Sequence, residues 1–285
     1  MGCLLLDGGV VRPDWCDRDS GLIMSDQATS LRGRACIVTG AGSGIGRAAA
    51  MIIADRGGAV VVADVSDSGA EVAAEIMERG GQAVFAQGDV CDASYAQELV
   101  DTSVAQFGSL DGLVNNAGIL RLADSFELTT DEHVAETMRV NFHAVFSLSR
   151  LALPALEASG SASIVNTASM VGFRIGMPGH AIYGASKAAV VGLSMTMAIE
   201  LAGRGVRVNC IAPGVVGTNF YVDEYLKEHS RAELEAGSAS TLSAIPIGTY
   251  AAPTQIAEVI AFLISDAASY VTGQTLIIDG GYTGI

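Results

Sequence analysis

The chain has 285 residues, of which 50% are hydrophobic and 16% are charged, and its formal net charge at neutral pH is −15. This composition indicates a folded protein with a large core and excludes an intrinsically disordered chain. The 31 acidic residues outnumber the 16 basic ones. Because such a surface repels phosphate backbones, we expect no nucleic-acid partner.

The first 30 residues and the cysteines bear on where the protein works. Residues 1–30 have no basic start and only a very short apolar run, unlike a signal peptide, so we expect a flexible extension. No apolar stretch approaches the roughly 20 residues that span a bilayer, so no membrane association is expected. The five cysteines and four histidines show no zinc-like spacing. We therefore expect a cytoplasmic protein without a metal site.

From residue 35 onward, short runs rich in β-branched residues alternate with longer helical patterns. Nearly continuous apolar runs are typical of parallel strands that are covered on both faces. The expected strands are residues 35–40, 59–64, 83–87, 112–116, 163–168, 206–212 and 275–279, and the expected helices are residues 44–56, 67–79, 93–107, 131–153, 183–203 and 254–265. No linker divides this alternation. We therefore predict one doubly wound (Rossmann-type) α/β domain over residues 31–285, with a parallel seven-stranded sheet and helices on both faces.

Two of the expected helical segments, residues 141–156 and 188–202, are apolar nearly all round. A helix at the surface of a monomer should have one polar face. We therefore expect these helices to be covered by other copies of the chain, in a homotetramer or a homodimer. Dense packing within one subunit is the alternative explanation.

The sequence TGAGSGIG, residues 39–46, lies between the first expected strand and the first expected helix. Glycines at Gly40, Gly44 and Gly46 allow a tight turn and a close approach of the backbone to a pyrophosphate at the helix N-terminus. An ordinary glycine-rich turn has a similar sequence. The strand before the motif and the helix after it favour a dinucleotide-binding loop.

The end of the second expected strand indicates which dinucleotide is bound. A carboxylate at Asp64 can accept hydrogen bonds from both ribose hydroxyls of an adenosine and repels a 2′-phosphate. Ser43 and Val65 offer no positive charge to neutralise that phosphate, and Arg47 falls inside the expected helix. The sequence therefore favours NAD over NADP, although a helix-capping role for Asp64 is the alternative. Asp89, after the third strand, suits a contact with the adenine edge.

Tyr183 and Lys187 lie four positions apart in the sequence YGASK, so a helix places both side chains on one face. A tyrosine normally ionises at about pH 10, too high for a base in neutral water. A nearby ammonium group, together with the positive ring of an oxidised nicotinamide, would stabilise the phenolate and lower its pKa. The phenol could then exchange a proton with an alcohol or a carbonyl during hydride transfer. A surface pair on a helix is the alternative interpretation.

Taken together, the motifs resemble those of the short-chain dehydrogenase/reductase family, and the resemblance extends from about Leu31 to Gly281. Seven matches follow one another in the family's order: TGAGSGIG (39–46), NNAG (115–118), VNF (140–142), IVNTAS (164–169), YGASK (183–187), IAPGVVGT (211–218) and VTGQTLIIDGG (271–281). Seven ordered matches are far more specific than one glycine-rich loop.

The resemblance implies a role for each catalytic residue. Tyr183 would be the general acid/base, and Ser169 would orient the substrate oxygen. Lys187 would lower the pKa of the phenol and bind the nicotinamide ribose, and Asn141 would hold a water that connects Lys187 to solvent. The cofactor residues that the resemblance implies are Gly40, Ser43, Gly44, Ile45, Gly46, Asp64, Asp89, Val90, Asn116, Ala117, Gly118, Tyr183, Lys187, Pro213, Gly214, Val216 and Thr218, with Asn115 also lining the adenosine side.

One spacing departs from many relatives. Ser169 and Tyr183 are 14 positions apart, about one more than expected, so we expect the intervening loop to bulge. Thr167 offers an alternative hydroxyl, two residues earlier on the same face of the strand and therefore deeper.

The substrate side is predicted to be mostly apolar. Residues 219–243 take the place of the family's mobile substrate lid and contain the candidate contacts Phe220, Tyr221, Tyr225 and Leu226, which could equally pack the lid onto the body. Loop 170–182 adds Phe173, Arg174, Ile175 and Met177. We expect NAD-dependent oxidation or reduction of a hydrophobic or cyclic secondary alcohol or ketone. An NADPH-dependent 3-oxoacyl reductase and a non-catalytic dinucleotide sensor are the alternatives.

Overall fold

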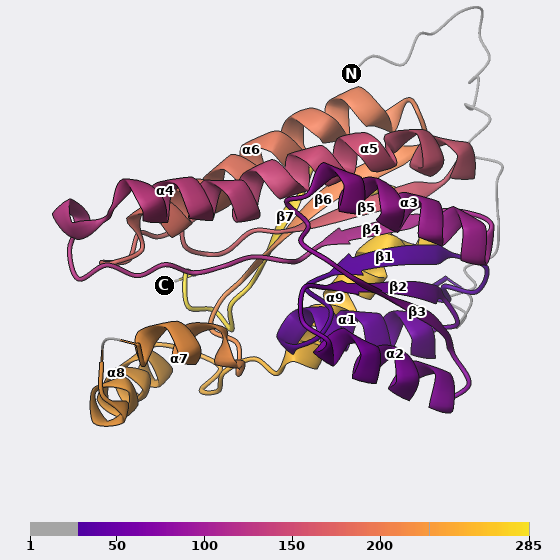
Figure 1. The fold of residues 1–285 in the computed structure, drawn as a ribbon. Coiled ribbons are helices and arrows are strands. Elements are labelled where there is room, and N and C mark those ends of the chain that lie inside the picture. The colour runs from indigo at the N-terminus through magenta and orange to yellow at the C-terminus, as the bar shows by residue number, and fades with distance from the viewer. Residues whose placement is uncertain (1–27, 228, 285) are drawn as a thin grey trace, which may run out of the picture.

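The computed structural model describes residues 28–227 and 229–284, which fold around a parallel sheet of seven strands (Figure 1). The strand order is β3-β2-β1-β4-β5-β6-β7, and each neighbouring pair is parallel. The predicted doubly wound fold with a parallel seven-stranded sheet is therefore confirmed. The strands are β1 (Ala35–Thr39), β2 (Ala59–Asp64), β3 (Gln82–Gln87), β4 (Gly112–Asn115), β5 (Ala162–Thr167), β6 (Val206–Pro213) and β7 (Thr275–Ile278).

Helices cover both faces of this sheet. The main ones are α1 (Gly44–Asp55), α2 (Ser68–Glu78), α3 (Ala93–Phe107), α4 (Asp131–Met138), α5 (Ala144–Ser159), α6 (Ala181–Ala202) and α9 (Pro253–Ile264). Helices α1, α2 and α9 lie on one face, and α3, α5 and α6 lie on the other (Figure 1). Short η1 (Phe126–Leu128) and η3 (Asp266–Ala268) segments complete the connections.

Strand β2 shows why almost every residue of these strands is apolar. Side chains alternate between the two faces of a strand. Val60 and Val62 therefore join the core beneath α1 and α9, whereas Val61 and Ala63 join the core beneath α3 and α5. All four side chains are fully buried, so neither face of the strand tolerates the polar residues of a half-exposed sheet.

The helix expected over residues 131–153 is interrupted and longer than predicted. Between α4 and α5 lies a π-helical turn, η2 (Arg139–His143), and α5 continues past Pro154 to Ser159. A proline inside a helix removes one backbone hydrogen bond, which made residue 153 a reasonable predicted end. The helix continues because Leu156 is buried in the core, and it ends at Gly160, which adopts a left-handed φ of 75°.

The segment predicted to be the substrate lid contains two helices, α7 (Asn219–Tyr225) and α8 (Arg231–Ser243), which stand apart from the sheet (Figure 1). Ser230 begins α8 with a capping box, in which its side chain and that of Glu233 satisfy each other's backbone N–H groups. These helices were not predicted, because the polar composition of α8 gives no apolar stripe.

The predicted extension, residues 1–30, falls almost entirely outside the described residues, whereas Leu31 is fully buried and begins the domain. The expectation that no apolar stretch is long enough to cross a membrane was wrong for α6, which reaches that length and composition. In the structure α6 packs against β6 and buries Ser186, Lys187 and Ser194, as the core helix of a folded domain does.

Candidate active site

The predicted site residues gather at the carboxyl edge of the sheet. Thr39 ends β1, Asp64 ends β2, Asn115 ends β4, Thr167 ends β5 and Pro213 ends β6. Ligands of doubly wound sheets bind in the crevice beyond these strand ends. The fold therefore brings together residues that are far apart in the sequence.

The loop between β1 and α1 can exist only with glycines. Gly40 and Gly44 adopt left-handed φ values of 62° and 52°. A Cβ atom added at Gly46 would lie 2.0 Å from the Gly40 carbonyl oxygen and 2.6 Å from Asn116 Nδ2. Ser43 precedes the helix without using its side chain as a cap, and Ile45 packs on the core. This tight turn presents backbone N–H groups at the start of α1, which suits a pyrophosphate.

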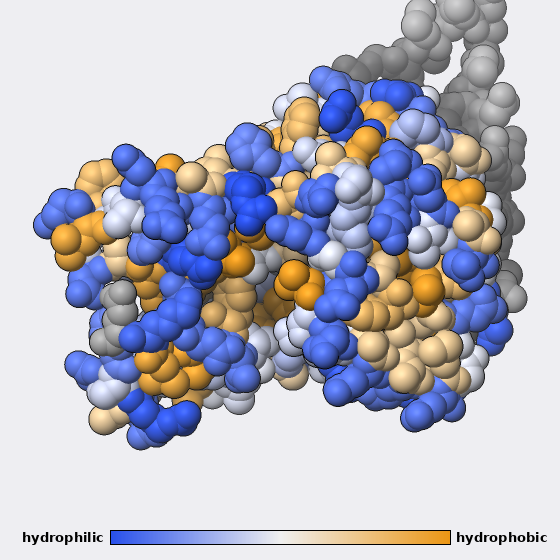
Figure 2. Space-filling model, in the orientation of Figure 1, coloured by the Kyte–Doolittle hydropathy of each residue, from blue (hydrophilic) through white to orange (hydrophobic). Residues whose placement is uncertain are grey.

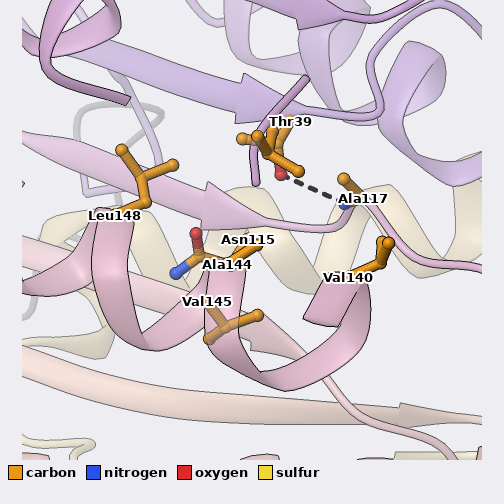
Figure 3. A pocket seen from close by; sticks show the side chains of 8 residues that line it. Thr39, Asn115, Ala117, Val140, Ala144, Val145 and Leu148 are labelled. Carbon is orange, nitrogen blue, oxygen red and sulfur yellow. Dashed lines mark hydrogen bonds between the residues drawn. The ribbon is translucent and has the colours of Figure 1, made fainter. Parts of the chain in front are cut away.

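Hydrogen bonds with Thr39 connect the NNAG segment, residues 115–118, to the start of this loop. Thr39 Oγ1 accepts hydrogen bonds from the backbone N–H groups of Asn116 and Ala117, each at 3.0 Å, the latter drawn in Figure 3. Asn116 Nδ2 donates to the Thr39 carbonyl oxygen at 3.0 Å. A small cavity lies beside this junction, with Val90 and Val140 in its wall. The Asn116 side chain thus shapes the site, while its backbone and that of Ala117 border it.

Asp64 keeps the position that the sequence predicts. Its carboxylate accepts the backbone N–H groups of Gly42 at 2.8 Å and Ser66 at 2.9 Å. A carboxylate has about four acceptor positions, so it can still receive two ribose hydroxyls. Arg47 is paired with Glu75 of α2, on the protein surface. In the chain alone, this cation is therefore engaged by a carboxylate of α2.

The Asp89 carboxylate already has hydrogen-bond partners within the chain. Its carboxylate accepts the Cys91 N–H at 2.9 Å and pairs with Arg139 at 3.1 Å. Partial burial acts to raise the pKa of Asp89, but these hydrogen bonds outweigh it and hold the pKa below its ordinary value. The predicted contact between Asp89 and adenine remains a prediction.

The end of β6 meets the glycine loop. The Gly214 N–H donates to the Ile278 carbonyl oxygen at 2.9 Å, and Val216 pairs with Ala251 in an isolated bridge. The Thr218 methyl group lies 3.3 Å from the position of a Cβ at Gly44. The segment from Pro213 to Thr218 therefore reaches the glycine loop at Gly44.

Tyr183 and Lys187 lie near the start of α6, as predicted. Lys187 Nζ is 5.7 Å from the centre of the Tyr183 ring and donates to the Thr167 carbonyl oxygen at 2.9 Å. Burial lowers the pKa of Lys187 to about 8. Burial raises the pKa of Tyr183 to about 12, and a hydrogen bond with Ser169 only partly opposes that shift.

These pKa values correct one expectation. In the chain alone, burial raises the pKa of Tyr183 and only a hydrogen bond with Ser169 opposes it, so the ammonium group of Lys187 by itself does not make the phenol acidic. A bound oxidised nicotinamide would add a positive charge beside the phenol and supply the acceptor for hydride. The residues fit such a group, because the glycine loop and Asp64 accommodate its adenosine half.

Asn141 sits in the π-helical turn η2 and is fully buried. Its Oδ1 accepts the Ile119 N–H at 2.8 Å, and its Nδ2 donates to the Ile119 carbonyl at 2.9 Å and to Ser186 Oγ at 3.1 Å. A Cβ added at Gly118 would lie 3.2 Å from Asn141 Oδ1 and 3.4 Å from Lys187 Nζ. The three residues therefore meet, and the water relay through Asn141 remains a prediction.

Ser169, rather than Thr167, is the hydroxyl that faces Tyr183. Ser169 Oγ accepts the Val171 N–H at 3.1 Å and interacts with the phenol. Thr167 Oγ1 is buried and has no hydrogen-bond partner among the described residues. The loop after Ser169 turns back, with a bridge between Val171 and Ile175, and packs on the start of α6.

Helix α7 of the predicted lid brings aromatic rings close to the candidate catalytic residues. The Phe220 ring centre is 6.2 Å from that of Tyr183, and Tyr221 stacks on His180 at 6.2 Å. Figure 2 shows the surface hollowed between the lid helices and the body of the domain. His180 was not predicted as a site residue, although its position three residues before Tyr183 places it close to that side chain.

A second feature missed from the sequence is the ion-pair cluster that ties the lid to the body. Arg121, after β4, pairs with Glu136 of α4 at 2.8 Å and with Glu224 of α7 at 3.2 Å. No local pattern reveals this cluster, because its members lie on three separate elements.

Known proteins match this chain over nearly its whole described length. A family model described as enoyl-(acyl carrier protein) reductase matches residues 40–283. A 3-oxoacyl-[acyl-carrier-protein] reductase of Thermotoga maritima is 39% identical, over 88% of this chain and 98% of that protein. A cis-4-hydroxycyclohexanecarboxylate dehydrogenase of Sinomonas cyclohexanicum is 38% identical, over 88% of this chain and 97% of that protein.

A solved structure shares the fold as well. It is described as an NAD(P)-dependent gluconate 5-dehydrogenase from Beutenbergia cavernae with NADP bound at low occupancy. Its TM-score is 0.82 at 41% identity, and the match covers 90% of this chain and all of that one. The motifs, the geometry of the site and these similarities agree. The chain belongs to the short-chain dehydrogenase/reductase family, oxidoreductases that bind a nicotinamide dinucleotide.

Proposed function

We propose that this enzyme transfers hydride between NAD(H) and a hydrophobic or cyclic secondary alcohol or its ketone, with Tyr183 as general acid/base. The observation that carries the choice of cofactor is the carboxylate of Asp64 at the end of β2, with Arg47 paired to Glu75. A 2′-phosphate at this place would meet a negative charge and no free positive partner from Arg47.

The catalytic residues divide the proton transfer between them. In the oxidative direction the Tyr183 phenolate would take the hydroxyl proton, and the carbinol carbon would give up its hydride, for which a bound NAD⁺ would supply the acceptor. Ser169 donates a hydrogen bond to the substrate oxygen and holds it beside the phenol. Lys187, fixed by the Thr167 carbonyl, holds an ammonium group near the phenol and would bind the nicotinamide ribose.

The walls near Tyr183 support a substrate with an apolar frame. Phe220 and Tyr221 of the lid present aromatic surface there, and Leu120 is buried beside the NNAG segment. Aromatic side chains favour apolar frames through the large area that they bury. One relative, cis-4-hydroxycyclohexanecarboxylate dehydrogenase, is named for a cyclic alcohol.

An NADPH-dependent 3-oxoacyl reductase is the second candidate, because a relative with that name is 39% identical. Such an enzyme must attract a carrier-bound substrate and a 2′-phosphate. In this chain Lys227 of the lid segment pairs with Glu224, and Asp64 disfavours the phosphate. Both observations support the first proposal over the second.

We also propose that the enzyme assembles through α5 and α6, as a homotetramer or homodimer. Phe146 of α5 and Met195 and Ile199 of α6 are exposed in the single chain, Ile199 by 84%. Burial of such side chains is worth about 1.5–3 kcal/mol each. Light scattering coupled to size exclusion would give the mass, and a monomer would contradict the proposal. The cytoplasmic location stays a prediction.

Steady-state assays test the function directly. Cyclohexanol with NAD⁺ and with NADP⁺ is compared with acetoacetyl-CoA reduction by NADH and by NADPH, each followed at 340 nm. We expect the highest kcat/KM for cyclohexanol with NAD⁺. Preferred reduction of acetoacetyl-CoA by NADPH would establish the second candidate, and binding of NADH without turnover of any substrate would indicate a dinucleotide sensor.

A further inference from the structure

His180 lies beside the reacting groups, yet the chemistry described above does not use it. It immediately precedes α6 and is only 8% exposed. Its ring meets Tyr183 edge-on at 6.3 Å and stacks on Tyr221 of the lid at 6.2 Å, with 6° between the planes. The imidazole is therefore fixed between the catalytic phenol and the lid.

One hydrogen bond decides which ring nitrogen carries the proton. His180 Nδ1 lies 2.8 Å from the Pro178 carbonyl oxygen, which can only accept, so Nδ1 must be the donor. Burial lowers the pKa of His180, which keeps the ring neutral near pH 7. A neutral imidazole protonated on Nδ1 presents Nε2 as a hydrogen-bond acceptor.

Nε2 is available to a ligand. It makes no hydrogen bond with the described residues, and it is not one of the fully buried side-chain atoms that lack a partner, as Thr167 Oγ1 is. The ring centre of His180 lies 6.3 Å from that of Tyr183 and 6.2 Å from that of the lid residue Tyr221, so a substrate bound at the phenol would lie close to this imidazole. The aromatic groups around it leave a polar acceptor in a mostly apolar wall.

We propose that His180 determines substrate specificity by accepting, at Nε2, a hydrogen bond from a second hydroxyl group of the substrate. The favoured substrates are then diols or hydroxyketones on a small, mostly apolar frame, rather than simple alcohols. A carboxylate or a second carbonyl at this place has no proton to donate and would face the lone pair of Nε2. The inference rests on the proposed function, since it takes the reacting oxygen to bind at Tyr183 and Ser169.

Paired substrates test the proposal. The kcat/KM with NAD⁺ is measured for cyclohexanol and for cis- and trans-1,2-cyclohexanediol. We expect at least one diol to be preferred about tenfold, because a site built around a hydrogen bond discriminates against the analogue that cannot form it. In His180→Phe the ratio of diol to cyclohexanol should fall to about one, and in His180→Gln, whose Oε1 can accept, part of the preference should return.

A matched control addresses the neighbouring ring. Tyr221→Phe keeps the stacked ring and removes the hydroxyl that this ring carries beside His180, so the diol preference should persist. NADH binding by fluorescence confirms that each variant is folded. Turnover of cyclohexanol without a diol preference, or a preference that survives in His180→Phe, would refute the proposed role of His180. Either result would leave the proposed function standing. Absence of turnover on all three alcohols in the wild-type enzyme would refute the proposed function instead.

Discussion

Replacing Asp64 should change which dinucleotide the enzyme prefers. Hydrogen bonds from ribose hydroxyls to a carboxylate are worth about 1.5–3 kcal/mol, so their loss should weaken use of NAD⁺ about 10- to 150-fold. Removing the negative charge also relieves its repulsion of a 2′-phosphate, about 1–4 kcal/mol for unit charges about 4 Å apart. Together these effects should lower the ratio of kcat/KM for NAD⁺ to that for NADP⁺ by at least about 50-fold.

The design must separate charge from loop structure. Asp64 also accepts the N–H groups of Gly42 and Ser66, so Asp64→Ala loosens the loop in addition to removing the charge. Asp64→Asn keeps the size of the side chain and one acceptor oxygen. The assay is steady-state oxidation of cyclohexanol with each coenzyme, with thermal unfolding as a control for folding. If both variants lose NAD⁺ and NADP⁺ activity equally, so that the ratio is unchanged, Asp64 supports the loop and does not read the ribose.

Three further perturbations test the catalytic and binding residues. Tyr183→Phe should lower kcat by about 10²- to 10⁴-fold while NADH titration by fluorescence shows unchanged binding; full activity would exclude Tyr183 as the acid/base. Gly46→Ala should weaken NADH binding, because its Cβ would lie 2.0 Å from the Gly40 carbonyl oxygen, whereas Gly237→Ala, with open space around it, should not; equal affinities would contradict the close approach. Lys187 has a pKa lowered by burial from 10.5 to about 8, so its protonation favours the unfolded chain and the folded state gains stability as pH rises from 8 towards 10.5. The melting temperature of the wild type relative to Lys187→Met should therefore increase over that range, and a constant difference would show that Lys187 is not desolvated.

The relation between Tyr183 and Lys187 shows how the fold assembles a reactive pair. Both side chains are desolvated, which moves the pKa of the phenol up and that of the ammonium down, each towards its neutral form. The Thr167 carbonyl at the end of β5 then fixes Nζ in place. The protein thus positions the proton carrier, and a cationic cofactor ring completes the electrostatics when it binds.

The alternation of strands and helices could be predicted from the sequence, in places with the correct bounds. Strand β2 has its predicted bounds, Ala59–Asp64, because a run that is apolar at every position is compatible only with a strand covered on both faces. The glycine loop could also be predicted, because a turn with so little room for a Cβ requires glycines, and glycines are visible in the sequence. The predicted end of the helix at residue 153 failed because burial of Leu156 outweighs the local cost of Pro154.

The proximity of Tyr183 and Lys187, the candidate catalytic pair, could be predicted from the sequence, because helical spacing places the two side chains together. The side chains that surround this pair could not be predicted. The stacking of His180 on Tyr221 and the pairing of Arg121 with Glu224 join segments on different elements. Periodicity reports which face of one element is buried, but it carries no information on which side chain of another element arrives there. The packing of the whole chain determines which side chains meet. Only the tertiary structure therefore revealed His180 beside Tyr183 and the ion pair between Arg121 and Glu224 of the lid segment.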